Sequence, residues 1–370
     1  MIIGIDASRY AHKEATGVEW YSFNIINHLL ELVSKNKEDS VVLYSREHLK
    51  IKHKDGIEVK FLPARRLWTI WKLSREMKKN PPDVLFVPSH VLPLRLPKKS
   101  VITIHDVAFR HLKKSYSYFQ YKYLDWSTKF AVKHAGKIVV PSKATKRDLK
   151  KFYDCPEEKI VVIPHGFSPP EITDAEIERA FENSHIFKYF EIIKSSKYFF
   201  FIGRLENKKN LVRLVEAFKD FSKKYPEYRL ILAGKRGVGF EQLLKVVKHL
   251  DLMDKVIMPG YVTEAEKAAL YAHCKGFLFP SLYEGFGLPI FEAFYYKKPV
   301  LTSHVSCLPE VAGDAAYYVD PYDVEAISLG IERIVADDEY VENLVKLGQE
   351  RLKLFSWKDA AKKTLWTIKQ

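Results

Sequence analysis

Short runs of β-branched and aromatic residues alternate along the chain with longer segments in which apolar residues recur at helical spacing. Each run has the length of a buried strand. The runs fall at residues 1–6, 40–45, 57–62, 83–87, 100–104, 137–140 and 159–163, and then at 198–202, 229–233, 255–258, 276–279 and 299–302. Strands that alternate with helices in this way predict an α/β fold with mostly parallel sheets.

The alternation is interrupted once, which divides the chain into two halves. A segment bounded by prolines at 164–170 and a polar helical stretch at 171–196 separate the seventh run from the eighth. Because domains usually have about 100 to 200 residues, a chain of 370 residues is expected to hold two of them. We therefore predict two Rossmann-like, doubly wound domains, at 1–170 and 197–354, joined by a linker helix at 171–196.

The last segment, residues 355–370, carries apolar residues at helical spacing and is followed by no further strand. Periodicity alone leaves two interpretations open. The helix either crosses back onto the first domain or completes the second.

Composition and cysteine content favour a globular protein of the cytoplasm. The chain is 47% hydrophobic and 29% charged, which is typical of folded rather than disordered proteins. Asp6 interrupts the first apolar run, so a secretory signal peptide is not expected, and no segment reaches the ~20 apolar residues of a membrane-spanning helix. The three cysteines are scattered and lack the spacing of a zinc site, so we expect reduced thiols and no structural metal.

The positive charge of the chain is concentrated in its first half. The net charge is +14, and residues 51–150 alone contain 23 Lys and Arg against 7 Asp and Glu. Such a surface can attract anionic lipid, nucleic acid or a phosphorylated substrate, or it can simply be solvated. Within it, segment 65–79 mixes Leu67, Trp68, Trp71 and other apolar residues with six Lys and Arg. This pattern fits a helix on an anionic membrane, but it equally fits an ordinary helix whose tryptophans are core residues.

Two segments that follow runs in the second half carry candidate chemistry. After run 198–202 come Gly203, Arg204 and Lys209, and two cations on a turn at a helix start suit a diphosphate. After run 276–279, Glu284 lies in a loop and Glu292 about one helical turn beyond Pro289. Carboxylates accept hydrogen bonds from sugar or ribose hydroxyls, although Glu284 could instead cap the helix and Glu292 could be merely exposed.

With these motifs in view, the sequence resembles the retaining glycosyltransferase family 4. The resemblance rests on FIGRLENKKNL (201–211), PSLYEGFGLPIFEA (280–293) with its two glutamates eight positions apart, and LPEVAGDAA (308–316). It continues through ATGVEWY (15–21), TIHDVAF (103–109), PSKATKRDL (141–149) and VIPHG (162–166) to FSWKDAA (355–361). The resemblance implies the GT-B fold, in which two Rossmann-like domains face a central cleft and the last helix crosses back to the first domain.

The resemblance also implies roles for particular residues. Arg204 and Lys209 would hold the donor diphosphate, Glu292 the ribose, and Glu284 the donor sugar, while His105 would lie beside that sugar. Residues whose backbone would approach the donor or its base are Gly17, Gly203, Phe286, Gly287, Leu288, Gly260, Tyr261 and Val262. The chain departs from the family pattern at Thr16 and at Lys297–Lys298, where glycines are common.

These features predict an enzyme that moves a hexose from a UDP- or GDP-sugar to a saccharide or lipid-linked acceptor. The chain contains no Asp-x-Asp, so we expect neither a metal nor another cofactor. We expect no nucleic acid partner, and at most peripheral contact with an anionic membrane. The alternative is a non-catalytic protein of the same fold that binds sugar nucleotides or nucleic acid. A nicotinamide-dependent oxidoreductase is disfavoured because no GxGxxG follows the first run.

Overall fold

The computed structural model describes residues 1–10, 16–35, 38–49, 51, 56–64, 67–180 and 197–370. The chain divides into two compact units. Unit 1 comprises 1–113, 117–166 and 355–370, and unit 2 comprises 114–116 and 167–354. Part of the linker expected at 171–196 lies outside the described residues. In the described part of that linker, Asp174–Glu178 form a short helix, α6.

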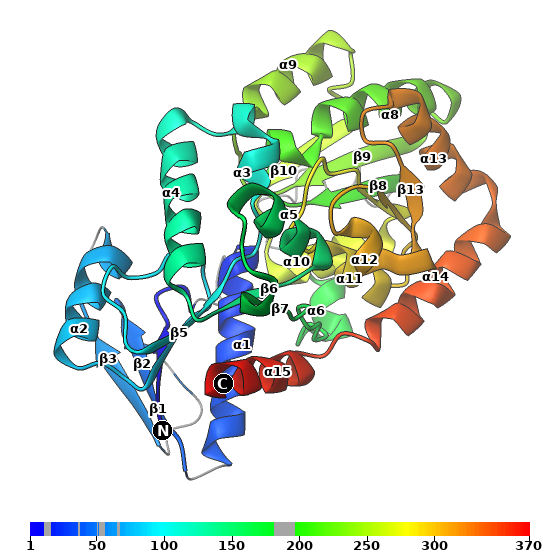
Figure 1. Cartoon of the computed structure of the whole chain (residues 1–370). Helices are drawn as coiled ribbons and strands as arrows, with labels where there is room; N and C mark the ends of the chain where they lie inside the picture. Colours follow the sequence, from blue (N-terminus) through cyan, green and yellow to red (C-terminus); the bar gives the residue numbers. More distant parts are fainter. Residues whose placement is uncertain (11–15, 36–37, 50, 52–55, 65–66, 181–196) are drawn as a thin grey trace. The chain divides into compact units, whose positions relative to one another are not determined.

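Unit 1 contains a seven-stranded parallel sheet in the order β3-β2-β1-β4-β5-β6-β7 (Figure 1). Its strands are β1 (Ile2–Asp6), β2 (Ser40–Ser45), β3 (Ile57–Phe61), β4 (Val84–Val87), β5 (Lys99–Thr103), β6 (Lys137–Val140) and β7 (Ile160–Val162). Its helices are α1 (Gly17–Ser34), α2 (Ser74–Lys79) after a π-helical turn at Thr69–Leu73, α3 (Ala108–His111), α4 (Tyr118–His134), α5 (Lys143–Tyr153) and α15 (Trp357–Lys369). The seven runs of the first half are thus all strands.

Unit 2 contains a six-stranded parallel sheet in the order β10-β9-β8-β11-β12-β13. Its strands are β8 (Lys197–Ile202), β9 (Tyr228–Ala233), β10 (Val256–Gly260), β11 (Gly276–Phe279), β12 (Val300–Ser303) and β13 (Tyr317–Val319). Its longer helices are α8 (Leu211–Lys224), α9 (Phe240–His249), α10 (Glu264–His273), α11 (Leu288–Tyr295), α13 (Val324–Ala336) and α14 (Asp338–Leu352), and α12 (Leu308–Ala312) is short. The predicted fold class is confirmed. Among the strands in the described residues, the short edge strand β13 is the one that the hydrophobic pattern did not predict.

The central strands of both sheets are buried because their residues are mostly apolar on both faces, whereas the edge strand β3 is partly exposed. In β8, Tyr198, Phe199, Phe200 and Phe201 are all at most 1% exposed, and β4 is equally enclosed. This pattern is typical of parallel sheets that helices cover on both sides. The carboxyl ends of the strands then carry the loops that lead into helices, and these loops are where ligands of such sheets bind.

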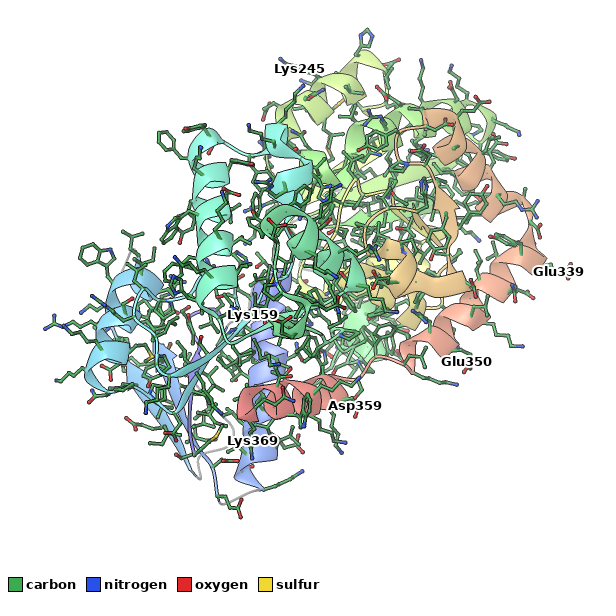
Figure 2. The ribbon with its side chains drawn as sticks, in the orientation of Figure 1. Lys159, Lys245, Glu339, Glu350, Asp359 and Lys369 are labelled. Carbon is green, nitrogen blue, oxygen red and sulfur yellow. The ribbon has the colours of Figure 1, made fainter. Side chains whose placement is uncertain are left out.

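The last helix packs on unit 1, which settles the alternative that periodicity left open. Figure 1 shows α15 beside α1, and Trp357 at its start is 2% exposed, with its ring 5.9 Å from that of Tyr21. At its other end, Lys369 forms an ion pair with Asp39 at 2.5 Å (Figure 2). Trp366, predicted as part of the apolar stripe, is instead 63% exposed.

Gly166, the last residue before the chain enters unit 2, touches the start of α15. A Cβ on Gly166 would lie 2.1 Å from the backbone nitrogen of Trp357, closer than any side chain can approach. Only glycine fits this position. The chain therefore leaves unit 1 and returns to it at a single place.

Candidate active site

In unit 2, the loop predicted to carry the cations lies beside the loop predicted to carry the carboxylates. The strand order reverses between β8 and β11, which are hydrogen-bonded neighbours, and such a switch point leaves room for a ligand beyond the strand ends. The loop after β8 carries Lys209 and the loop after β11 carries Glu284. The loops are joined by a hydrogen bond in which the Leu282 amide donates to the Lys208 carbonyl at 2.8 Å.

Lys209 and Glu284 form a buried ion pair. Nζ of Lys209 lies 2.6 Å from Oε1 of Glu284, and the two side chains are only 11% and 8% exposed. The ammonium also lies 4.8 Å from the ring centre of Phe279, the last residue of β11. An ammonium has three donor hydrogens, so Lys209 can bind an anion while it keeps the carboxylate in place.

Arg204 differs from Lys209 because it is exposed. Its aliphatic stem runs along Gly237, where a Cβ would lie 2.8 Å from Cγ of Arg204. Arg204 takes part in no ion pair within the described residues. Its guanidinium is consequently available to a ligand at the surface of the same loop.

Three glycines bring the ends of β8, β9 and β10 together. Gly203, Gly234 and Gly260 all have positive φ, at 149°, 136° and 86°. A Cβ on Gly234 would lie 1.8 Å from the Gly203 carbonyl oxygen, and the Gly234 amide donates to the Gly260 carbonyl at 2.7 Å. Sequence reasoning missed Gly234, although it follows the run 229–233 just as Gly203 follows 198–202.

The segment expected to meet the nucleobase begins at Gly260. A Cβ there would meet nothing within 4 Å, so the backbone borders open space. Next along the chain, the Tyr261 ring lies 4.9 Å from Nζ of Lys235, and Val262 is 4% exposed. Val262 is therefore part of the core, whereas the backbone of Gly260 is open on the side where a Cβ would point.

The loop from Glu284 to Leu288 is fixed by two side chains that sequence reasoning missed. Oγ of Ser306 accepts from the Glu284 amide at 3.0 Å. Sγ of Cys307 lies 3.1 Å from the carbonyl oxygens of both Glu284 and Phe286. Gly287 then takes φ 115° and Leu288 begins α11, so the first amides of α11 lie directly after Glu284.

Glu292 is held by a second lysine. Nζ of Lys267 lies 2.7 Å from Oε1 of Glu292, and the hydroxyl of Tyr271 lies 3.2 Å from Oε2 and 3.0 Å from the Pro289 carbonyl oxygen, which share its one proton. Burial alone would lower the pKa of Lys267, but the carboxylates of Glu292 and Glu264 outweigh it and raise that pKa. Each of the two predicted carboxylates thus has its own lysine. Lys267 went unnoticed in the sequence because it lies 25 residues away on α10.

His105, which follows β5 in unit 1, is neutral and oriented. Its Nε2 donates to the Pro88 carbonyl at 3.0 Å, which leaves Nδ1 as the acceptor atom of the ring. Burial, and secondarily the nearby His90, lowers the pKa of His105 to about 4. The ring packs edge-on against Tyr21, with the ring centres 4.7 Å apart.

Gly17 is the first residue of α1 and is exposed. Among the described residues, a Cβ there would meet nothing within 4 Å, so no contact with them requires glycine at this position. Thr16, at the departure from the family pattern, caps the helix. Its amide and hydroxyl both donate to Oε2 of Glu19, at 2.9 and 2.8 Å. Ala15 lies outside the described residues.

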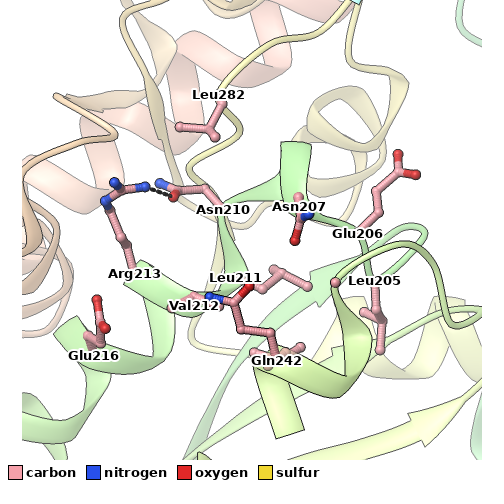
Figure 3. A pocket seen from close by; sticks show the side chains of 12 residues that line it. Leu205, Glu206, Asn207, Asn210, Leu211, Val212, Arg213, Glu216, Gln242 and Leu282 are labelled. Atoms are coloured by element: carbon pink, nitrogen blue, oxygen red, sulfur yellow. Dashed lines mark hydrogen bonds between the residues drawn. The ribbon is translucent and has the colours of Figure 1, made fainter. Parts of the chain in front are cut away.

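A hollow of about 310 Å³ lies beside this site, at the starts of α8 and α9 (Figure 3). Asn210 fixes its wall, because its side chain donates to the Pro321 carbonyl at 2.6 Å and accepts from Arg213 at 3.0 Å. The lining includes Glu206, Asn207 and Leu282 but neither Lys209 nor Glu284. The hollow therefore adjoins the Lys209 loop without containing the ion pair.

Two properties of the described part of the chain bear on metals and membranes. No three His, Cys, Asp or Glu side chains there lie together in a group that could hold a metal ion. Within the same residues, none of the helices combines the length and the apolar character that crossing a bilayer requires.

Family models match both halves of the chain. Residues 16–169 match the model described as Glycosyltransferase Family 4, and residues 183–351 match Glycosyl transferases group 1. The chain is 29% identical over 307 residues to the O-antigen chain mannosyltransferase B of Escherichia coli, which covers 82% of this chain and 76% of that protein. It is 25% identical to the O-antigen chain mannosyltransferase RfbU of Salmonella typhimurium, over 87% of this chain and 88% of that one.

Solved structures show the same fold. The sucrose-phosphate synthase of Thermosynechococcus elongatus superimposes with a TM-score of 0.76 over 100% of this chain and 98% of that one, at 20% identity. The Anabaena protein HepE, solved in complex with UDP-glucose, gives a TM-score of 0.72 over 100% and 99% of the two chains, at 14% identity. The chain therefore belongs to the family 4, group 1 glycosyltransferases and is a glycosyltransferase of the GT-B type.

Proposed function

We propose that this glycosyltransferase transfers mannose, with retention of configuration, from a GDP- or UDP-sugar to a growing surface polysaccharide. Two relatives that each cover more than 80% of the chain are named O-antigen chain mannosyltransferases, which favours mannose among the hexoses. The observation that carries the proposal is the buried Lys209–Glu284 pair at the switch point of unit 2. It joins a phosphate-binding cation to a hydroxyl-binding carboxylate.

In this proposal Lys209 and Arg204 stabilise the departing diphosphate. Negative charge grows on the β-phosphate as the bond from the sugar C1 to the phosphate oxygen breaks. Cations that are already in place favour that charge more in the transition state than in the ground state. Lys209 is fixed by its ion pair, whereas the exposed Arg204 closes on the diphosphate when the donor binds.

The remaining residues orient the donor. Glu284 and the amides of Phe286, Gly287 and Leu288 bind the sugar hydroxyls, and Glu292 binds the ribose. Lys267 and Tyr271 occupy one site on each Glu292 oxygen, so other lone pairs remain for the ribose hydroxyls. Nδ1 of the neutral His105 accepts a hydrogen bond from a sugar hydroxyl. The backbones of Gly203 and Gly260 border the diphosphate and the base.

We further propose a front-face displacement that needs no metal. The acceptor oxygen bonds to C1 on the face from which the phosphate oxygen departs, and the acceptor proton passes to that phosphate oxygen. Lys209 and Arg204 supply the positive charge that a divalent cation supplies in metal-dependent transferases.

The acceptor in this proposal is a saccharide, free or linked to a lipid. The excess of Lys and Arg in residues 51–150 suits an acceptor that carries phosphate or lies at an anionic bilayer. The enzyme would then work in the cytoplasm, with peripheral contact with the inner face of the membrane.

Donor identity is tested with a panel of nucleotide sugars, scored by donor hydrolysis and by the shift in melting temperature. We expect a mannose donor, GDP-mannose or UDP-mannose, to stabilise the protein and to be turned over, and turnover of other hexose donors alone would contradict the assignment of mannose. Lys209→Ala is the matched control, which should lose turnover. Stabilisation without turnover by any donor, with or without mannan oligosaccharides as acceptors, would indicate a non-catalytic binding protein.

A further inference from the structure

Helix α4 of unit 1 buries small and polar residues and exposes large aromatic ones, which is the reverse of an ordinary surface helix. The residues buried against the rest of the unit are small or polar, namely Ser127, Thr128 and Ala131 with Val132. The exposed face carries the large aromatic residues. Phe119 is 83% exposed, Tyr118 67%, Trp126 42% and Tyr123 40%. A helix that needs only to cover the sheet would bury these rings instead.

Three exposed aromatic residues and the half-buried Phe130 form a stripe along the helix axis. Phe119, Tyr123, Trp126 and Phe130 follow one another at intervals of four, three and four residues, which places them on one face. The ring centres of Tyr123 and Trp126 are 6.0 Å apart, and those of Trp126 and Phe130 are 5.9 Å apart. At a rise of about 1.5 Å per residue, this aromatic stripe is roughly 16 Å long.

A second stripe, of lysines, runs beside the first. At 100° per residue, Lys122, Lys129 and Lys133 fall within about 40° of one another and next to the aromatic stripe. All three are exposed. The single acidic residue of the helix, Asp125, lies on the inner side, where it pairs with Arg110 and Lys129. The outward face of α4 therefore combines aromatic rings with net positive charge.

Segment 65–79, the sequence candidate for membrane contact, has this character only in part. Arg65 and Arg66 lie outside the described residues. Trp68, Leu73 and Met77 are at most 4% exposed and belong to the core, while Trp71 is 69% exposed. This segment thus supplies one exposed tryptophan, whereas α4 supplies an ordered row of rings.

We propose that α4 docks unit 1 on an anionic lipid bilayer, with the aromatic stripe in the headgroup region and the lysines against the lipid phosphates. This inference deepens the membrane contact of the proposed function and rests on it. Aromatic rings prefer the membrane interface, and lysines beside them suit an anionic surface. The charge excess of residues 51–150 supplies the same complementarity over the rest of the unit.

The test is binding of the full chain to vesicles of phosphatidylcholine with phosphatidylglycerol, compared with pure phosphatidylcholine, by flotation. Two variants probe α4: Phe119→Ser/Trp126→Ser/Phe130→Ser for the rings and Lys122→Gln/Lys133→Gln for the charge. Trp366→Ser is the matched control, because Trp366 is also an exposed tryptophan in a lysine-rich helix of unit 1. Donor hydrolysis in solution and melting temperature check that each variant is folded.

We expect wild type and Trp366→Ser to bind the anionic vesicles alike and to be released at 1 M salt, where the Debye length falls to about 3 Å. The ring variant should bind at least ~30-fold more weakly. Each lysine removed should weaken binding about fivefold. Wild-type binding that the ring variant retains would overturn the role of α4 and leave the membrane contact standing.

A wild type that binds no vesicle would overturn the role of α4 and the membrane contact together. Donor hydrolysis, measured separately, would still test the transferase activity. Sedimentation of the free protein completes the test. If the ring variant turned a wild-type dimer into a monomer, the stripe would be a surface for a second copy, and the bilayer assignment would be wrong.

Discussion

Replacing Lys209 with methionine should damage stability and turnover for separable reasons. Methionine keeps the length of the side chain but removes the charge, so the carboxylate of Glu284 is left 8% exposed without its cation. Loss of one partner of a buried ion pair lowers the free energy of unfolding by about 3 kcal/mol or more. For a unit of this size the melting temperature should fall by roughly 6–12 °C.

Turnover should fall by about 100- to 1,000-fold, the scale for losing one preorganised charge contact with a transition state. The double variant Lys209→Met/Glu284→Gln separates the two effects. Glutamine removes the uncompensated charge, so the double variant should regain at least half of the lost melting temperature. It should regain none of the lost turnover.

Melting is followed by calorimetry, and turnover by release of the nucleoside diphosphate at saturating donor. A Lys209→Met protein with wild-type turnover would refute the leaving-group role of Lys209. If the double variant melted below the single variant, the uncompensated carboxylate would not be the source of the instability.

Four further predictions concern other parts of the chain. Arg204→Ala should lower turnover about 100-fold without changing the melting temperature, because Arg204 is exposed; a drop of several degrees would contradict its placement. Excess EDTA should leave the rate unchanged, and activity abolished by EDTA and restored by magnesium or manganese would show that a metal takes part. Lys297 has φ 55°, so Lys297→Gly should stabilise unit 2 by about 0.5–1 kcal/mol in urea unfolding, whereas Lys298→Gly next to it should not. The pKa of His105 is about 4 in the folded chain against 6.5 in the unfolded chain, so the unfolded chain takes up the proton first as the pH falls. The free energy of unfolding should therefore drop by about 2 kcal/mol between pH 7 and 5 through His105. His105→Gln should remove this contribution, which urea unfolding at the two pH values would measure.

The strands and both motif loops could be predicted because their signals are local. Each buried strand is a compact apolar run, and each motif follows such a run directly, as Gly203 follows 198–202. The edge strand β13 escaped notice because it has three residues, two of which are only half-buried.

The partners of the site residues could not be predicted, because they come from other elements. Lys267 reaches Glu292 from α10, and Ser306 and Cys307 reach the Glu284 loop from the segment after β12. The ion pair between Lys209 and Glu284 spans 75 positions. Such contacts depend on the order of strands in the sheet, which the spacing of hydrophobic residues does not encode.

The touching backbones of Gly166 and Trp357 make residues 167–354, which are all of unit 2 except 114–116, an insertion within unit 1. The two ends of the insertion leave the host unit at one place, so a loop of a few residues is long enough to close the gap that its removal would leave. Residues 167–354 can therefore be exchanged as a single cassette. If the proposed donor contacts of unit 2 are right, most of the donor site would then be encoded in one continuous stretch of gene, which could be replaced while unit 1 stays unchanged.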